Sequence, residues 1–278
     1  MVAFALHACA TIAADITAAT WNLEWFPSHT PNIRKSEEIE QKLINAAGEI
    51  VKQSEPNILF IQEIRDKESC EKLVSATEIK NLQIAVCSDF KDMAGISLFQ
   101  QCAILTTYPV IKAGFEKWHT FGIIDPPRGF VYAVLDIKGE LVVCFGLHLK
   151  SNLRKTDQDH QLNILKRELA IEQLMEFIAT SRDLQKITKI IIAGDFNTTL
   201  DDFQYASEKT LRMLLDAGFV DGFDNIPQED RVTLPAKGIY ADVTFDYIFW
   251  KGFATQKVVS VVSKSNVSDH ALVRVELE

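Results

Sequence analysis

Hydrophobic residues in this chain form two patterns, short apolar runs and longer segments with helical spacing. After Ser36, apolar residues recur at the helical period, which predicts a helix that is capped by Ser36 and ends near Gln53. The same spacing predicts further helices over residues 67–80, 158–179 and 207–217.

Short apolar runs rich in Ile, Val, Leu and Phe predict strands between these helices. Many of the runs are apolar on both alternating faces, so we expect sheets packed face to face inside an outer layer of amphipathic helices. No Gly/Ser-rich linker or repeat interrupts this order, which favours one domain. The predicted strands cover residues 15–22, 58–61, 82–87, 102–106, 110–115, 130–137, 141–148, 189–193, 245–250, 256–262 and 271–277.

Polar residues stand where most of these apolar runs end or begin. Polar groups at strand ends, gathered on one rim of a sandwich, are how α/β enzymes build their sites. The residues in these positions are Asn22, Glu63, His148, Asp195, Asn197, Asp246, Asp269 and His270.

Three of these residues are suited to holding a metal ion. The side chains of Glu63, Asp269 and Asn22 offer hard oxygen ligands of the kind that Mg²⁺ and Mn²⁺ prefer. A bound divalent ion would neutralise charge on a phosphate group. The set therefore suits displacement at phosphorus.

The other residues are suited to positioning water and phosphate. Asp195 can orient or deprotonate an attacking water, and the amide of Asn197 can donate to a phosphoryl oxygen. His148 and His270 can donate to phosphate or move protons. Which of Asp195 and His270 takes the proton of the water stays open at this point.

Six short motifs resemble the endonuclease/exonuclease/phosphatase superfamily, the DNase I-like phosphoesterases that depend on a metal ion. Each motif alone is weak, but six in the family's order, spread over residues 15–278, are specific. The motifs are Trp21-Asn22-Leu23-Glu24-Trp25, Ile61-Gln62-Glu63, Gly146-Leu147-His148-Leu149-Lys150-Ser151, Gly194-Asp195-Phe196-Asn197, Phe245-Asp246-Tyr247-Ile248 and Ser268-Asp269-His270.

This resemblance implies an α/β fold, a four-layer αββα sandwich with two mainly antiparallel sheets packed face to face and helices outside. It also implies that Mg²⁺ or Mn²⁺ is the cofactor. Glu63 would be the main metal ligand, with Asn22 and Asp269 nearby. Residues 15–278 would form the whole domain.

The resemblance assigns the remaining roles as well. Asp195 and Asn197 would orient water and phosphate, and Asp246 would orient the imidazole of His270. His148 would contact the scissile phosphate. Arg128 follows two prolines, at a place where family members carry a phosphate-binding arginine.

Each of these residues also has a purely structural interpretation. Asn22 could cap a turn, and Asp195 with Asn197 could form a turn after a strand. Asp246 could be a buried carboxylate that is satisfied by hydrogen bonds. Glu24 is interpreted as a residue on the solvent side rather than a ligand.

The motifs favour a nuclease that cleaves DNA or RNA, without fixing the substrate. Ile64 stands where apurinic-site endonucleases usually carry Thr, and Phe196 stands where inositol-phosphate phosphatases usually carry Leu. A sphingomyelinase-like lipid phosphodiesterase and a phosphatase of the same superfamily are the enzymatic alternatives. A binding module with a decayed site is the non-enzymatic one, which the filled polar positions disfavour.

The charge of the chain changes this picture in one respect. A sum of 29 basic and 38 acidic residues gives a net charge of −9, which disfavours binding to nucleic acid through a broad basic surface. A nucleic acid substrate would have to be held locally, by the metal, His148, His270 and Arg128. Lys150, Arg154 and Lys155 could extend this positive strip. We expect a monomer, and no membrane insertion because no apolar stretch of about 20 residues exists.

The N-terminus resembles a secretory signal over residues 1–14, where apolar and small residues precede Asp15. No Lys or Arg occurs before Arg34, so an N-terminal tail leading into the first strand is the alternative. With a signal the protein would be exported to the periplasm or the medium, and without one it would be cytoplasmic. For Cys87 and Cys102, on consecutive predicted strands, we expect either a disulfide or two buried thiols.

Overall fold

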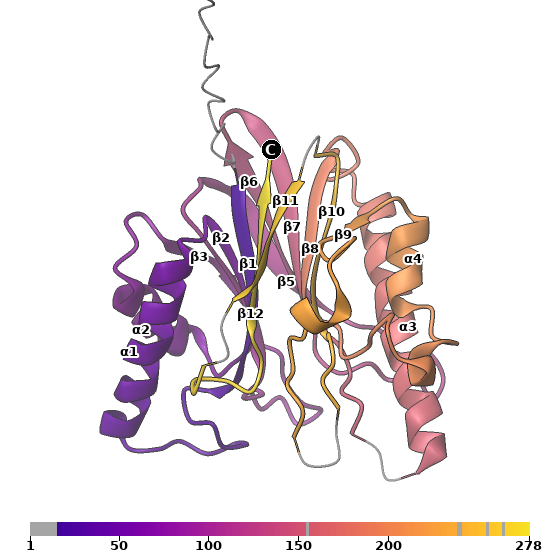
Figure 1. Cartoon of the computed structure of the whole chain (residues 1–278), viewed down its shortest axis with the longest axis horizontal. Helices are drawn as coiled ribbons and strands as arrows, with labels where there is room; N and C mark the ends of the chain where they lie inside the picture. The colour runs from indigo at the N-terminus through magenta and orange to yellow at the C-terminus, as the bar shows by residue number, and fades with distance from the viewer. Residues whose placement is uncertain (1–15, 154–155, 238–240, 254–255, 263–264) are drawn as a thin grey trace, which may run out of the picture.

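The computed structural model describes residues 16–278 apart from 154–155, 238–240, 254–255 and 263–264. The expected signal over residues 1–14 therefore lies outside the described residues. Within them, two six-stranded sheets pack face to face, and helices cover both outer faces (Figure 1). This confirms the predicted four-layer αββα sandwich.

The first sheet contains the N-terminal and C-terminal strands of the domain. Its order is β11-β12-β1-β2-β4-β3, with β1 and β2 parallel and the other described neighbours antiparallel. Two helices lie against its outer face (Figure 1). The elements are β1 (Ile16–Phe26), α1 (Glu37–Ser54), β2 (Ile58–Ile64), α2 (Lys67–Thr77), β3 (Gln83–Cys87), β4 (Gln101–Thr106), β11 (Gln256–Val262) and β12 (Leu272–Leu277).

The second sheet has the same plan. Its order is β5-β6-β7-β8-β10-β9, and again the central pair, β7 and β8, is parallel. In each sheet a long helix connects the two parallel strands. The elements are β5 (Val110–Lys117), β6 (Gly129–Ile137), β7 (Glu140–His148), α3 (Asp157–Thr180), β8 (Lys189–Asp195), α4 (Thr210–Asp216), β9 (Val220–Asp221) and β10 (Asp246–Lys251), with short 3₁₀ turns at Phe203–Tyr205 and Gln228–Asp230.

The repeated plan brings four strand ends together. A hydrogen bond between Asn22 of β1 and Asp195 of β8 shows that the carboxyl ends of the two parallel pairs meet across the space between the sheets. We call this edge of the sandwich the site end. The predicted polar positions gather there because each follows or opens a strand at that end.

Close packing of the sheets depends on two glycines near the site end. A Cβ atom on Gly146 would lie 2.7 Å from Val131 and 3.5 Å from Phe60 of the facing sheet. Gly194 has φ +149°, and a Cβ atom there would lie 2.0 Å from the carbonyl oxygen of Leu147. Any larger residue at either position would push β7, β8 or the facing sheet aside.

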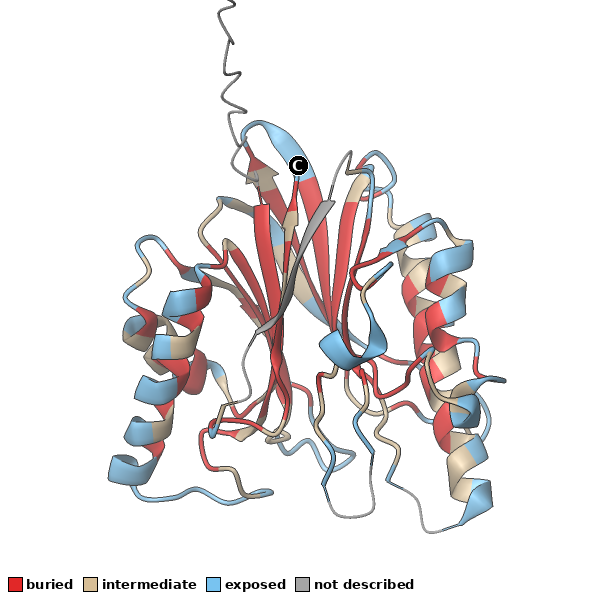
Figure 2. Cartoon of the chain, in the orientation of Figure 1, coloured by how far each residue is buried: buried red, intermediate tan, exposed pale blue. Residues whose placement is uncertain are grey.

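Buried residues run along both sheets and along the inner faces of the helices (Figure 2). The strand alternation explains the two hydrophobic clusters. Ala19, Trp21 and Ile61 face α1 and α2, whereas Ala18 and Phe60 face the space between the sheets. Among the described helices, none combines the length and the apolar character that a membrane span needs.

The expectation of a disulfide between Cys87 and Cys102 is wrong. Cys87 lies opposite Ala103 in the register of β3 and β4, and both residues belong to the face covered by helices. Cys102 is one residue away, so its side chain points to the other face and into the core between the sheets. Both thiols are free.

The spacing of apolar residues predicted where the helices lie, but it did not predict their exact ends. The backbone of Ser36 precedes α1 as an N-cap, but its side chain makes no capping hydrogen bond. Asp66 caps α2, and Thr156 with Asp159 forms a capping box at α3. The helix expected over 207–217 is shorter, and strand β9, two residues long, had no signal of its own.

Candidate active site

Asn22 joins the two sheets at the site end. Its side-chain nitrogen donates to Asp195 Oδ2 at 2.9 Å and lies 3.4 Å from Glu63 Oε1, while its oxygen accepts from the backbone N–H of Glu24 at 3.0 Å. Asn22 is buried. The amide nitrogen, rather than the oxygen, therefore faces the carboxylates.

Glu63 reaches the site because its backbone leaves the strand conformation. Ile61 faces the outer cluster, so regular alternation places Gln62 inward and Glu63 outward, under the helices. The φ of Glu63 is +60°, and β1 has a bulge opposite it. The carboxylate then accepts from the backbone N–H of Trp25 at 2.9 Å.

Several neighbours of Glu63 share this left-handed conformation. For a residue other than glycine, it costs about 1–3 kcal/mol and is concentrated at functional sites. Of the twelve described residues other than glycine with positive φ, five lie in segments that converge on the site end. The residues are Glu24, Trp25, Glu63, Arg128 and Asn197.

The segment Ser268–His270 is fastened to the end of β1. Ser268 Oγ donates to the carbonyl oxygen of Asn22 at 2.6 Å and accepts from the backbone N–H of His270 at 3.0 Å. The indole N–H of Trp21 donates to the carbonyl oxygen of His270 at 3.0 Å. These bonds place Asp269 and His270 beside Asn22.

Asp246 and His270 form the hydrogen-bonded pair that the sequence predicted. Nδ1 of His270 lies 2.7 Å from Asp246 Oδ2, and Asp246 is fully buried. Thr233 holds the backbone of Asp246, because its Oγ1 accepts from the backbone N–H of Asp246 at 3.1 Å. The other carboxylate oxygen, Oδ1, is buried without a hydrogen bond to a described residue. Nε2 of the imidazole is left facing the site, 4.0 Å from Asp269 Oδ1.

The carboxylates around His270 set its charge. Burial alone would lower the pKa of His270, but Asp246, Asp195 and Asp269 raise it to about 10. The imidazole is therefore a cation at neutral pH, with Asp246 as its counterion. A protonated His270 cannot accept a proton from water.

Asp195, unlike His270, is suited to accept a proton near neutral pH. Burial raises its pKa, Asp246 raises it further, and the result is about 7, although His270 and the hydrogen bonds from Asn22 and Asn197 oppose the change. Asp195 and Asp246 lie opposite each other in the register of β8 and β10. A carboxylate with a pKa near neutrality is suited to accept a proton.

His148 lies between the two sheets and is neutral. Its Nε2 is 3.6 Å from Asp195 Oδ2 and 3.7 Å from Glu63 Oε1. Burial lowers its pKa well below the ordinary value, and the positive charges of Arg128, His270 and Lys150 lower it further. Nδ1 is buried and makes no hydrogen bond with a described residue.

Arg128 and Asn197 hold the backbone that follows β7. Arg128 donates to the carbonyl oxygens of His148 and Leu149 at 3.0 and 2.7 Å. Asn197 donates through its backbone N–H to Asp195 Oδ1 at 2.9 Å, and its side-chain nitrogen lies 3.3 Å from the carbonyl oxygen of Leu149. All the predicted site residues are thus at the site end; their chemical roles stay predictions.

The donor set at this end fits a divalent metal ion. The carboxylates of Glu63, Asp195, Asp246 and Asp269 are concentrated there. The pKa of Asp195 is raised first by burial and then by the charge of Asp246. Glu63 and Asp269 are the partly exposed members and would hold the ion, since hard oxygen ligands suit Mg²⁺ or Mn²⁺.

A second arrangement of possible ligands overlaps this set. One atom each of Asp195, Asp246 and His270 lie within 4.8 Å of one another. Nδ1 of His270 is already bonded to Asp246, and a protonated imidazole does not bind metals. We therefore interpret this trio as the acid–base cluster.

Sequence patterns missed three structural contributors. Glu24, interpreted from the sequence as a solvent-side residue, is half-buried and accepts from the backbone N–H of Asp269 at 3.2 Å. Thr233, which holds the backbone of Asp246, lies outside the six sequence motifs. Arg167 of α3 pairs with Glu208 in a buried ion pair and donates to the carbonyl oxygen of Lys150 at 3.0 Å; its position on a helical face gave no signal.

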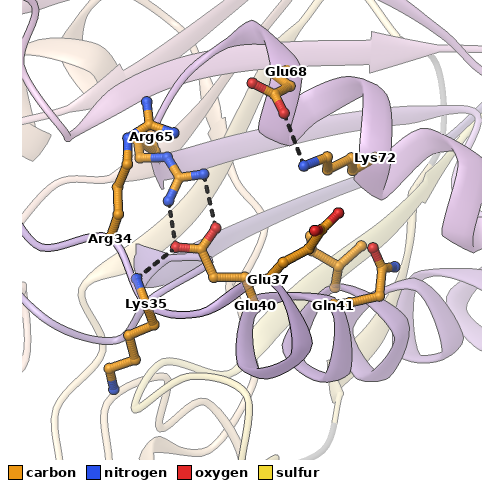
Figure 3. Close-up of a pocket in the computed structure, with 9 residues that line it drawn as sticks. Arg34, Lys35, Glu37, Glu40, Gln41, Arg65, Glu68 and Lys72 are labelled. Carbon is orange, nitrogen blue, oxygen red and sulfur yellow. Dashed lines mark hydrogen bonds and ion pairs between the residues drawn. The ribbon is translucent and has the colours of Figure 1, made fainter.

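A polar hollow between α1 and α2 is separate from this site. Figure 3 shows Arg65 directed at Glu40 through two hydrogen bonds of 2.6 and 2.9 Å, and Lys72 paired with Glu68. These two ion pairs account for four of the charged side chains that line it, and none of the predicted site residues lines it. The hollow is a structural ion-pair cluster.

The fold and these side chains define a hydrolase that acts on phosphoester bonds. The model of the Endonuclease/Exonuclease/phosphatase family matches residues 19–270, so the chain belongs to that family. Members of the family generally depend on a divalent metal. No curated protein matches this chain.

Solved structures share the fold at low sequence identity. TDP2 from Caenorhabditis elegans aligns with a TM-score of 0.63 and 17% identity, over 94% of this chain and 74% of that one. The mannosyl-6-phosphatase from Bacteroides thetaiotaomicron VPI-5482 aligns with a TM-score of 0.62 and 15% identity, over 95% and 99%. At such identities the likeness shows the fold alone.

Proposed function

We propose that this chain is a metal-dependent nuclease that hydrolyses phosphodiester bonds of DNA or RNA. The observation that carries the proposal is the convergence of Asp195, the Asp246–His270 pair and Glu63 at the site end. The attacking water would form a bond to phosphorus while the ester P–O bond breaks, and the proton of the water would pass to the enzyme.

Asp195 is the group that would take this proton. One of its oxygens accepts from the backbone N–H of Asn197 and the other from the side chain of Asn22, so the carboxylate has a fixed orientation. Its pKa of about 7 allows proton transfer near neutral pH. The structure thus favours Asp195 over His270 as the general base.

His270 would stabilise the developing charge on the phosphoryl group. Its Nδ1 is held by Asp246, so the N–H of Nε2 is the group free to donate. His148, which is neutral, would supply a second donor. A divalent ion held by Glu63 and Asp269 would neutralise the charge of the phosphate.

The proposal of nucleic acid as substrate rests on two cations beside His148. Arg128 donates to backbone carbonyls and to Gln100, and Lys150 donates to Ser151; neither forms a salt bridge with a residue that the structure describes. The guanidinium of Arg128 is buried behind these bonds and can act on a phosphate through its charge, whereas Lys150 is half-buried and can contact one. Arg154 and Lys155 lie outside the described residues. The net charge of the whole chain is −9, so its overall charge does not attract a nucleic acid.

One observation favours a second candidate, a phosphodiester of a lipid headgroup. Strand directions place the β3–β4 and β5–β6 loops at the site end. Their tips expose large apolar side chains: Phe121 and Ile123 are 74% and 84% exposed, and Met93 is fully exposed. Phe121 and Ile124 pair through two backbone hydrogen bonds, which hold this apolar tip in a compact turn that could enter a membrane surface.

A substrate panel tests the proposal. Purified protein is incubated with plasmid DNA, single-stranded RNA, sphingomyelin vesicles and mannose 6-phosphate, in Mg²⁺, in Mn²⁺ and in EDTA. We expect cleavage of DNA or RNA that EDTA abolishes and that Asp195→Asn loses. Intact nucleic acids together with release of phosphocholine would select the lipid candidate, and release of phosphate from the monoester alone would select a phosphatase.

A matched pair of variants examines the apolar tip directly. Ile123→Ser removes an exposed side chain at the site end, and Ile111→Ser removes one at the opposite end of β5, where Ile111 is 58% exposed. If nucleic acid is the substrate, both variants match the wild type on DNA and RNA. A selective loss of vesicle hydrolysis in Ile123→Ser would support the lipid candidate.

A further inference from the structure

Two cysteines meet on the outer face of the first sheet. Cys70 lies in the first turns of α2 and is fully buried in the cluster between the helices and this sheet. Cys87 ends β3 and packs against the same cluster. Helix α2 packs directly against β3, and both thiols belong to the cluster between them. Cys87 Sγ lies 3.7 Å from the carbonyl oxygen of Ser88, and a hydrogen bond between the thiols of Cys87 and Cys70 raises the pKa of Cys70.

The other described cysteines cannot reach this pair. Cys102 and Cys144 are buried in the core between the two sheets, on the far side of the first sheet from Cys70. A disulfide requires Cβ atoms about 3.5–4.5 Å apart, which two faces of one sheet do not allow. Cys9 lies outside the described residues.

We propose that Cys70 and Cys87 are an oxidation site that forms a disulfide between α2 and β3. Cys87 is partly exposed, so an oxidising reagent can reach it first. The site requires an oxidant of the disulfide class, and its formation would follow export to an oxidising compartment.

The chemistry balances with oxidised glutathione as the reagent. The thiolate of Cys87 attacks one sulfur atom of glutathione disulfide, which releases one glutathione thiolate and leaves a mixed disulfide on Cys87. Cys70 then loses its proton and attacks the sulfur of Cys87, which releases the second glutathione. The protein loses two protons and two electrons, and the reagent is reduced to two thiols.

The second step is the slow one. In the reduced protein the hydrogen bond with Cys87 and burial both raise the pKa of Cys70. Burial still raises it once Cys87 carries glutathione, so few molecules hold the attacking thiolate at a given moment. Once formed, the bond closes a loop from the start of α2 to the end of β3. It would fix the helix that follows Glu63 to the edge of the sheet, and by restricting the unfolded chain it raises the melting temperature by about 5–10 °C.

Peptide mapping of the intact chain tests this inference. The reduced protein is incubated with oxidised glutathione, its remaining thiols are alkylated in denaturant, and the digest is analysed by mass spectrometry. We expect one cross-link, between the peptides of Cys70 and Cys87, with Cys102 and Cys144 alkylated. The oxidised protein should melt about 5–10 °C above the reduced protein.

Two variants make the test specific. Cys87→Ala should abolish both the cross-link and the difference in melting temperature, whereas Cys102→Ala should keep both. A cross-link of Cys87 to Cys9 or Cys102 would overturn the proposal. So would a glutathione adduct on Cys87 that persists without resolution by Cys70.

Discussion

At the residue scale, the charge of His270 depends on Asp246. In the wild type, activity should rise with pH as Asp195 loses its proton near 7 and should fall as His270 loses its own near 10. Asp246→Asn removes a charge that raises both pKa values, so both limbs of the pH–rate profile should move to lower pH. We expect kcat at the optimum to fall by about 100-fold.

A buried carboxylate elsewhere provides the control for this profile. Asp221 pairs with Phe249, three residues further along β10, and accepts from the backbone N–H of Phe223 without contact to His270. Asp221→Asn should leave both limbs in place. If the profile of Asp246→Asn keeps the alkaline limb of the wild type, Asp246 does not set the charge of His270.

The sequence predicted which residues reach the site, and geometry decided how they are used. Strand ends and motifs identified Glu63, yet regular alternation would have placed its carboxylate under the helices; only the left-handed backbone brings it to Asn22. The sequence also left the general base open. Burial next to Asp246, which no motif reports, distinguishes Asp195 from His270.

At the scale of elements, Arg167 and Glu208 join α3 to the loop before α4. The guanidinium makes two bonds of 2.7 and 2.6 Å to the carboxylate, and both side chains are buried. Arg167→Met leaves Glu208 buried without its counterion, so we expect a loss of about 3–5 kcal/mol in the free energy of unfolding, measured in urea.

An exposed ion pair gives the comparison. Glu38 and Lys42 lie one turn apart on α1 in solvent, and Glu38→Gln should cost less than about 1 kcal/mol. A double variant, Arg167→Met with Glu208→Leu, should recover part of the stability because no buried charge is left unpaired. If Arg167→Met and the wild type have the same free energy of unfolding, the ion pair does not stabilise the fold.

Two kinds of pattern predicted the elements: helices bury one apolar face, and the central strands are short apolar runs that are buried on both faces. Helix α1 and strands β2, β7 and β8 follow from their patterns within a few residues. The exceptions are set by partners distant in sequence: β9 is two residues that pair with β10, and the face on which Cys87 lies depends on its register with β4. A single strand does not carry that information.

At the scale of the whole molecule, an acidic body must bind any nucleic acid through few contacts. Arg128 and Lys150 are the two uncompensated cations described beside the site. Two phosphate contacts predict that kcat/KM on a short duplex falls about tenfold between about 50 and 200 mM salt. A fall of about a thousandfold would reveal an extended cationic surface that contradicts this account.

The central claim is that Glu63 holds a divalent ion on which phosphodiester hydrolysis depends, and a Mg²⁺ titration of Glu63→Gln tests it most directly. The substitution keeps the shape of the side chain and removes its charge. We predict a kcat/KM about 10²–10³-fold below the wild type at limiting Mg²⁺, partial recovery as Mg²⁺ rises, and an unchanged circular dichroism spectrum. Wild-type turnover of Glu63→Gln at limiting Mg²⁺ would contradict the claim.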